Sequence, residues 1–115
     1  MLRITTWRMI GAPPAGTTPQ TAFQAVQDMC TALEKIPGAG HVRWYIGNQS
    51  IVTVGEPENY GVADAILKSP QAQQAVGKVF ALGYTIAEDL FLLDLSQAMP
   101  FTQAQLAAAP QLVHA

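Results

Sequence analysis

The residues with the widest chemical repertoire lie together in the segment His41-Val42-Arg43-Trp44-Tyr45. Successive side chains of an extended strand point to opposite faces, so His41, Arg43 and Tyr45 would share one face. Histidine titrates near neutral pH, which suits general-base work, and an arginine or a tyrosine hydroxyl can stabilise an enolate oxygen. We therefore take these three as the candidate catalytic residues.

Their spacing limits the chemistry that they can do together. On a strand, the Cα atoms of His41 and Tyr45 would lie about 13 Å apart, whereas a nucleophile and its base need heavy atoms within about 3 Å. The two side chains could instead bracket an elongated aromatic ligand, with Arg43 holding an oxyanion or a carboxylate between them. The alternative is that His41 and Arg43 make inter-sheet or inter-subunit ion pairs with carboxylates such as Asp89 or Asp94.

Two tryptophans and one aspartate are candidate ligand-binding residues: Trp7, Trp44 and Asp89. Alternation along the first strand places Trp7 with Arg3, and we expect both to join His41 on the sheet face that is turned away from the helices. Trp44 falls on the opposite phase and would face the helices. Both tryptophans could equally be packing residues, because large rings are frequent in cores and interfaces.

Metal and nucleotide sites are not expected. His41 and His114 are far apart in the sequence, and Cys30 is the single cysteine, so a cluster of metal ligands is lacking. The glycine-containing segments 11–16 and 38–40 lack the lysine and the following helix of a phosphate loop. We predict that the protein uses no metal and no other cofactor.

Composition narrows the function classes further. The chain has 115 residues, enough for one domain, and only 12% are charged while 50% are hydrophobic. A net charge of −2 does not suit binding to nucleic acid. Without an apolar run long enough to span a membrane or a signal-like start, a cytoplasmic location is expected. The low charge leaves apolar surface, which predicts self-association.

Helix and strand signals alternate along the chain. Thr18-Pro19 and Ser69-Pro70 each combine a hydroxyl N-cap with proline at the first helical position. They predict one helix that ends at Pro37-Gly38 and a second helix in two pieces, 60–68 and 70–82. The four predicted strands cover residues 2–10, 41–47, 50–55 and 84–95. We expect a domain over residues 1–96, then a tail (97–115) with a short helix near 102–109.

The last predicted strand carries leucine or phenylalanine on both alternation phases between Asp89 and Leu95. A strand with one face in water would alternate apolar and polar residues, so both faces of this one should be covered. The order β-α-β-β-α-β is that of an α+β, ferredoxin-like fold: a four-stranded antiparallel sheet with two helices on one face. We therefore expect a second copy of the chain to cover the other face.

This element order, the hairpin near Asn48, and the segments 69–73 and 91–94 resemble the dimeric α/β barrel superfamily. The resemblance implies a homodimer or higher homo-oligomer formed through the sheet face. Members include cofactor-independent monooxygenases, haem-degrading enzymes and isomerases. The haem-degrading branch carries an asparagine on the first strand, where this chain has Thr5 and Thr6, so the resemblance does not extend to that branch.

Two functions remain open at this point. The first is a cofactor-independent monooxygenase or isomerase-like enzyme acting on an aromatic or enolisable small molecule. It predicts a closed, mostly apolar pocket of about 300 Å³ or more, reached by His41 or Tyr45. The second is a non-catalytic ligand-binding or assembly protein of the same fold, in which those side chains serve subunit contacts. In either case the interface should bury roughly 2,000 Å² or more in total. A Phe91→Asp or Leu93→Asp substitution should break assembly or unfold the chain.

Overall fold

The computed structural model describes residues 1–93 and contains four strands and three helices in that range. Their bounds, in chain order, are β1 (Leu2–Met9), α1 (Pro19–Glu34), β2 (Arg43–Ile46), β3 (Ser50–Gly55), α2 (Tyr60–Lys68), α3 (Pro70–Phe80) and β4 (Tyr84–Leu92). The predicted order is confirmed, and so is the division of the second helical segment into α2 and α3. The helix expected near 102–109 lies outside the described residues.

Both predicted helix starts are confirmed. The Thr18 hydroxyl accepts from the Thr21 backbone N–H and begins α1. The Ser69 hydroxyl accepts from the Ala72 N–H, so this residue ends α2 and caps α3 at once. Gly83, at φ +96°, makes the turn from α3 into β4, and a Cβ there would lie 2.9 Å from a backbone oxygen. A left-handed turn this crowded requires glycine.

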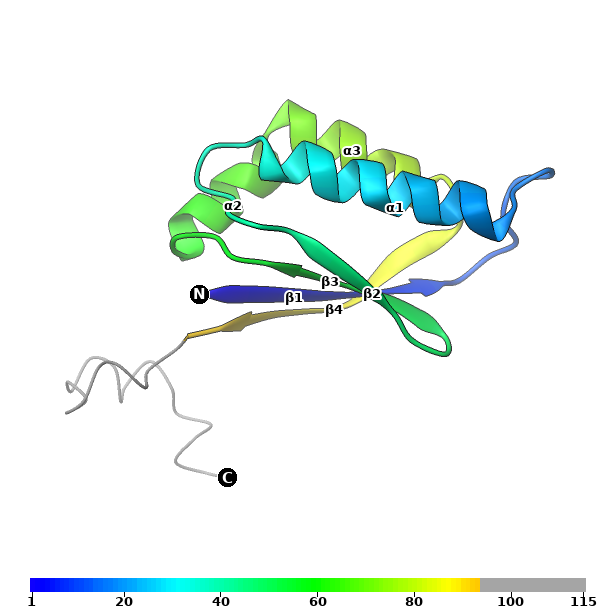
Figure 1. Cartoon of the computed structure of the whole chain (residues 1–115), viewed down its shortest axis with the longest axis horizontal. Helices are drawn as coiled ribbons and strands as arrows, with labels where there is room; N and C mark the ends of the chain where they lie inside the picture. Colours follow the sequence, from blue (N-terminus) through cyan, green and yellow to red (C-terminus); the bar gives the residue numbers. More distant parts are fainter. Residues whose placement is uncertain (94–115) are drawn as a thin grey trace, which may run out of the picture.

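The sheet is antiparallel throughout, with strand order β2-β3-β1-β4. All three helices lie on one face of it (Figure 1). This is the α+β, ferredoxin-like fold that the element order predicts. In the described residues, no helix combines the length and the apolarity needed to cross a membrane.

The main core lies between the helices and the sheet. Trp7 from β1 and Ile51 from β3 pack there against Val26, Cys30 and Val79 from the helices, and all five are at most 4% exposed. Burial, together with the nearby charge of Glu34, raises the pKa of the Cys30 thiol to about 11. The single cysteine is therefore a packing residue.

The opposite face of the sheet, here called the open face, is covered by none of the described helices (Figure 1). Residues directly opposite each other on paired strands share a face. Leu90 and Leu92 of β4 pair with Ile4 and Leu2 of β1 on the open face. The two β4 leucines are 42% and 45% exposed. The helix-side face of β4 carries Phe91, so apolar residues lie on both faces of this strand. That a second copy covers the open face stays a prediction.

The predicted placement of β1 is wrong. Arg3 and Trp7 point toward the helices, because Trp7 pairs with the core residue Ile51 and packs on Phe80 of α3, with ring centroids 5.6 Å apart. Trp7 is the largest apolar side chain of β1, and its burial decides which face turns inward. Arg3 follows it by alternation.

Arg43 and Tyr45, which the sequence predicts on the same face as Arg3 and Trp7, lie on the opposite face of the sheet. Arg43 pairs with Val54, and Tyr45 pairs with Val52 on the open face. Phe91 pairs with Arg3 and therefore also faces the helices. Of the two substitutions predicted to break assembly or unfold the chain, Phe91→Asp would thus act inside one subunit.

Candidate functional site

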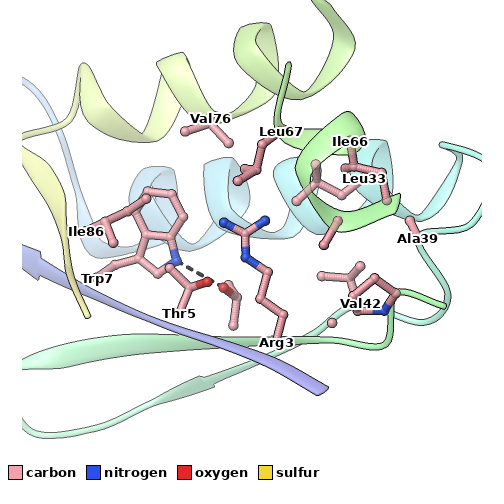
Figure 2. Close-up of a pocket in the computed structure, with 14 residues that line it drawn as sticks. Arg3, Thr5, Trp7, Leu33, Ala39, Val42, Ile66, Leu67, Val76 and Ile86 are labelled. Atoms are coloured by element: carbon pink, nitrogen blue, oxygen red, sulfur yellow. Dashed lines mark hydrogen bonds between the residues drawn. The ribbon is translucent and has the colours of Figure 1, made fainter. Parts of the chain in front are cut away.

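A pocket lies between the sheet and the helices, directly above the middle of β1 (Figure 2). Its helix side is apolar and is formed by Leu33 of α1, Ile66 and Leu67 of α2, and Val76 of α3. Its sheet side is mixed and includes four residues of β1 and β3: Arg3, Thr5, Trp7 and Thr53. The helices thus supply the apolar wall and the two central strands supply the polar groups.

Arg3 is the single ionisable residue among those that line this pocket in the described chain. Its side chain rises from β1 toward the helices, between Trp7 on one side and Leu33 on the other (Figure 2). Only 14% of the side chain is exposed. A cation in such surroundings is costly unless a counter-ion accompanies it.

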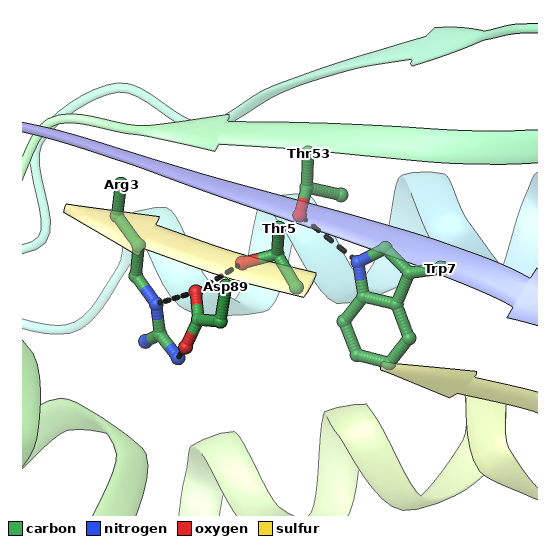
Figure 3. A network of polar contacts seen from close by, with 5 residues as sticks. All are labelled: Arg3, Thr5, Trp7, Thr53 and Asp89. Carbon is green, nitrogen blue, oxygen red and sulfur yellow. Dashed lines mark hydrogen bonds and ion pairs between the residues drawn. The ribbon is translucent and has the colours of Figure 1, made fainter. Parts of the chain in front are cut away.

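Asp89 of β4 supplies that counter-ion (Figure 3). The Arg3 Nε donates to Asp89 Oδ1 at 3.0 Å, and Nη2 donates to Oδ2 at 2.7 Å. The Thr5 hydroxyl donates to Oδ1 at 2.9 Å. These three hydrogen bonds hold the carboxylate from two sides and fix its orientation. The Arg3 guanidinium also lies 5.3 Å from the centre of the Phe91 ring.

Trp7 is held in place by a hydrogen bond inside the core. Its indole N–H donates to the Thr53 hydroxyl at 3.0 Å, and both residues are buried (Figure 3). This bond satisfies a donor that would otherwise be desolvated without a partner. It leaves the ring as a rigid wall of the pocket.

The pocket is smaller than the sequence-based enzyme hypothesis requires. Its volume is about 80 Å³, against the roughly 300 Å³ expected for an ordinary ligand site. Leu67 and Ile86 line it and are each 36% exposed, so they stand where it meets solvent. A cavity of this volume suits a single small ring, and a larger ligand requires these two side chains to move.

The three candidate catalytic residues lie outside the pocket. His41 forms an ion pair with Glu34, whose carboxylate also accepts from the Val42 backbone N–H at 2.8 Å. The Val42 hydrogen bond is the main reason that the pKa of Glu34 falls below 4.5, and His41 contributes less. Arg43 lies 3.5 Å from Glu56. These contacts tie α1 and the end of β3 to the beginning of β2.

Tyr45 is 52% exposed on the open face. The structure therefore separates Tyr45 and Arg43 from the pocket by the thickness of the sheet. Their catalytic role, like that of His41, stays a prediction that the geometry of the described residues does not favour. The ion pairs predicted for His41 and Arg43, with carboxylates such as Asp89 or Asp94, are not the ones that the described residues show. His41 and Arg43 pair with Glu34 and Glu56, Asp89 pairs with Arg3, and Asp94 lies outside the described residues.

Of the three candidate ligand-binding residues, two lie in or beside the pocket and one lies away from it. Trp7 lines the pocket, and Asp89 contacts two residues that do so. Trp44 lies elsewhere, with its indole N–H donating to Gln27 at 2.8 Å and its ring packed near Phe23 of α1. Their role in binding remains a prediction.

Sequence reasoning missed Thr53 and Leu67. Neither residue carries a local signal, because their place at the pocket depends on how β3 pairs with β1 and how α2 lies on the sheet. Within residues 1–93, no three histidine, cysteine, aspartate or glutamate residues gather in a way that could hold a metal ion.

Comparisons with known proteins identify the fold. No protein-family model matches the sequence, and no curated protein matches it. Among solved structures, SnoaB, a cofactor-independent oxygenase from Streptomyces nogalater, is similar with a TM-score of 0.65 and 14% identity, covering 87% of this chain and 96% of SnoaB.

Two further solved structures are similar in fold to this chain. An antibiotic biosynthesis monooxygenase has a TM-score of 0.57 and 11% identity, with 82% of this chain and 100% of that chain covered. A dimeric ferredoxin-like protein of unknown function from Thermobifida fusca has a TM-score of 0.55 and 15% identity, with 81% and 92% covered. At these identities the likeness establishes the fold alone. The chain therefore has a ferredoxin-like fold, as these solved structures do.

Proposed function

We propose that the pocket between the sheet and the helices binds a small aromatic or enolisable molecule, and that the chain oxygenates it without a cofactor. The observation that carries this proposal is the Arg3 guanidinium, a hydrogen-bond donor held inside an otherwise mostly apolar pocket. Similarity in fold to a cofactor-independent oxygenase supports the reaction type.

The geometry suits stabilisation of an enolate. Asp89 occupies Arg3 Nε–H and one N–H of Nη2, so the second N–H of Nη2 and both N–H groups of Nη1 are left as donors for a ligand oxygen. A fixed positive group beside a developing oxyanion is worth most in a site that excludes water. Asp89 does not itself line the pocket but contacts two residues that do, and it is the base that we propose for the proton of the substrate carbon. The enolate carbon would then react with O₂, and a CH₂ group plus O₂ would give a C=O group plus water.

A non-catalytic ligand-binding role is the second candidate, and one observation favours it. Asp89 accepts three hydrogen bonds, two of them from a cation. These bonds tie the carboxylate to Arg3 and Thr5, and Asp89 is not among the residues that line the pocket. If the substrate needs a base inside the pocket, the pocket binds it without turning it over.

We also propose that two copies of the chain pair through their open faces. The exposed leucines of β4 support this arrangement, as does the similarity in fold to the dimeric protein from Thermobifida fusca. A second copy would cover the apolar surface that the helices leave bare. Arg43 also lies on the open face. Its Nε is buried and has no hydrogen-bond partner among the described residues.

Oxygen uptake tests the enzymatic proposal. Small dihydroxybenzenes and cyclic ketones, which are uncharged at neutral pH, would be offered to the protein in an oxygen electrode, with product identified by mass spectrometry. We expect enzyme-dependent uptake that Arg3→Gln abolishes. Arg8→Gln is the matched control, because it makes the same substitution on β1 at an exposed position outside the pocket. Binding of these compounds without any oxygen uptake would favour the non-catalytic alternative.

A further inference from the structure

The charge balance of the pocket determines which ligands it can accept. Arg3 and Asp89 are paired through two hydrogen bonds, and the third, from Thr5, fixes the carboxylate without adding charge. The polar end of the pocket is therefore a neutral unit that still offers donors. The remaining walls are dominated by Leu33, Ile66, Leu67 and other apolar side chains.

From this arrangement we infer that Asp89 makes the pocket selective for uncharged ligands: a carbonyl or hydroxyl oxygen is accepted by Arg3, and a carboxylate of the same shape is rejected. The inference rests on the proposed binding function of this pocket and adds its specificity-determining residue. It does not depend on whether a reaction follows binding.

A ligand carboxylate meets two obstacles at this position. It can contact Arg3 while Asp89 stays in place, which sets two negative groups beside one guanidinium and leaves a net negative charge among apolar side chains. It can otherwise displace Asp89, which would abandon the three hydrogen bonds of that carboxylate in a position where only 27% of the side chain is exposed. A neutral oxygen meets neither obstacle.

Benzamide and benzoate are suitable probes, because they have the same shape and differ in charge. Each is a single ring with one planar substituent, so both probes require the same movement of Leu67 and Ile86, and the comparison isolates the effect of charge. The readout is the indole N–H resonance of Trp7 in a ¹H–¹⁵N spectrum of uniformly labelled protein. Trp44, the second of the two tryptophans, is bonded to Gln27 away from the pocket and is an internal control.

In the wild-type protein we expect benzamide to shift the Trp7 resonance at a concentration at least about tenfold below that needed for benzoate, a ratio that corresponds to about 1.4 kcal/mol. In Asp89→Asn the arginine keeps its charge and loses its counter-ion. The asparagine side-chain oxygen can still accept from Thr5. We expect this variant to bind benzoate more tightly than benzamide, and the Trp44 resonance to stay in place in both proteins.

The outcomes separate the two proposals. If neither probe shifts the Trp7 resonance of the wild-type protein, the pocket does not bind small molecules, and the proposed function is overturned together with this inference. If both probes bind the wild type equally well, the inference of charge selectivity is overturned and the proposed binding function is not. This comparison uses the wild-type protein only. If Asp89→Asn is folded and keeps the preference for benzamide, the selectivity does not come from Asp89.

Discussion

Replacing Leu90 with aspartate should dissociate the proposed homodimer without unfolding the subunit. Leu90 lies on the open face of β4 and is 42% exposed in the single chain. Complete burial of a leucine side chain is worth about 1.5–3 kcal/mol. Covering the exposed part of Leu90 should therefore contribute roughly 1 kcal/mol per copy, and roughly 2 kcal/mol to a symmetric dimer in which the residue occurs twice.

Loss of that contribution alone would raise the dissociation constant about 30-fold. Leu90→Asp also places two carboxylates in the interface, each of which loses several kcal/mol of hydration without a partner. Together these effects should raise the dissociation constant more than about a thousandfold. Because the side chain points away from the core, the subunit itself should keep its fold.

Sedimentation velocity over a wide concentration range measures this effect, with circular dichroism as the check on folding. Gln73→Asp is the control, because it adds the same charge at an exposed position on α3, away from the open face. We expect the wild type and the control to sediment as dimers and Leu90→Asp as a monomer. A wild type that stays monomeric at high concentration, or a Leu90→Asp variant that stays dimeric, would refute the reasoning.

Three further predictions concern the inside of the subunit. Thr53→Val should lower the free energy of unfolding by about 1–3 kcal/mol in urea titrations, because it leaves the buried Trp7 indole N–H without an acceptor; an unchanged midpoint would mean that this donor finds another partner. The pKa of Glu34 lies below its ordinary 4.5, chiefly because of the Val42 N–H, so its contribution to stability is present above about pH 4.5 and is lost as the pH falls through the folded-state pKa. The stability difference between the wild type and Glu34→Gln should therefore shrink in acid, and a difference that grows as the pH falls would contradict this assignment. Cys30, with its pKa raised to about 11, should react with a thiol reagent at pH 8 only after denaturation, and rapid labelling of the native protein would show that the thiol is not buried.

The order of the elements could be predicted because each boundary carries its own local signal. Thr18-Pro19 and Ser69-Pro70 specify helix starts by residue type alone. Gly83 supplies the conformation that the turn into β4 requires. These signals lie within a few residues of the feature that they determine, so they can be recognised without tertiary information.

The site could not be predicted in the same way, because it depends on strand register. From its residue type alone, Arg3 would be assigned to an exposed face. It faces inward because Asp89, which is 86 residues away in the sequence, neutralises its charge. Thr53 acquires its role only when β3 pairs with β1 and brings its hydroxyl beside Trp7. Alternation divides the residues of each strand into two sets but does not say which set faces inward.

Ligands should bind on the helix side of the sheet, next to Arg3, and not on the open face. A crystal structure of the wild-type protein soaked with benzamide tests this placement. We predict density for the ring between Trp7 and Leu67, with its amide oxygen within hydrogen-bond distance of Arg3. A ring bound on the open face beside Tyr45 and Arg43, with the helix-side pocket empty, would contradict the account.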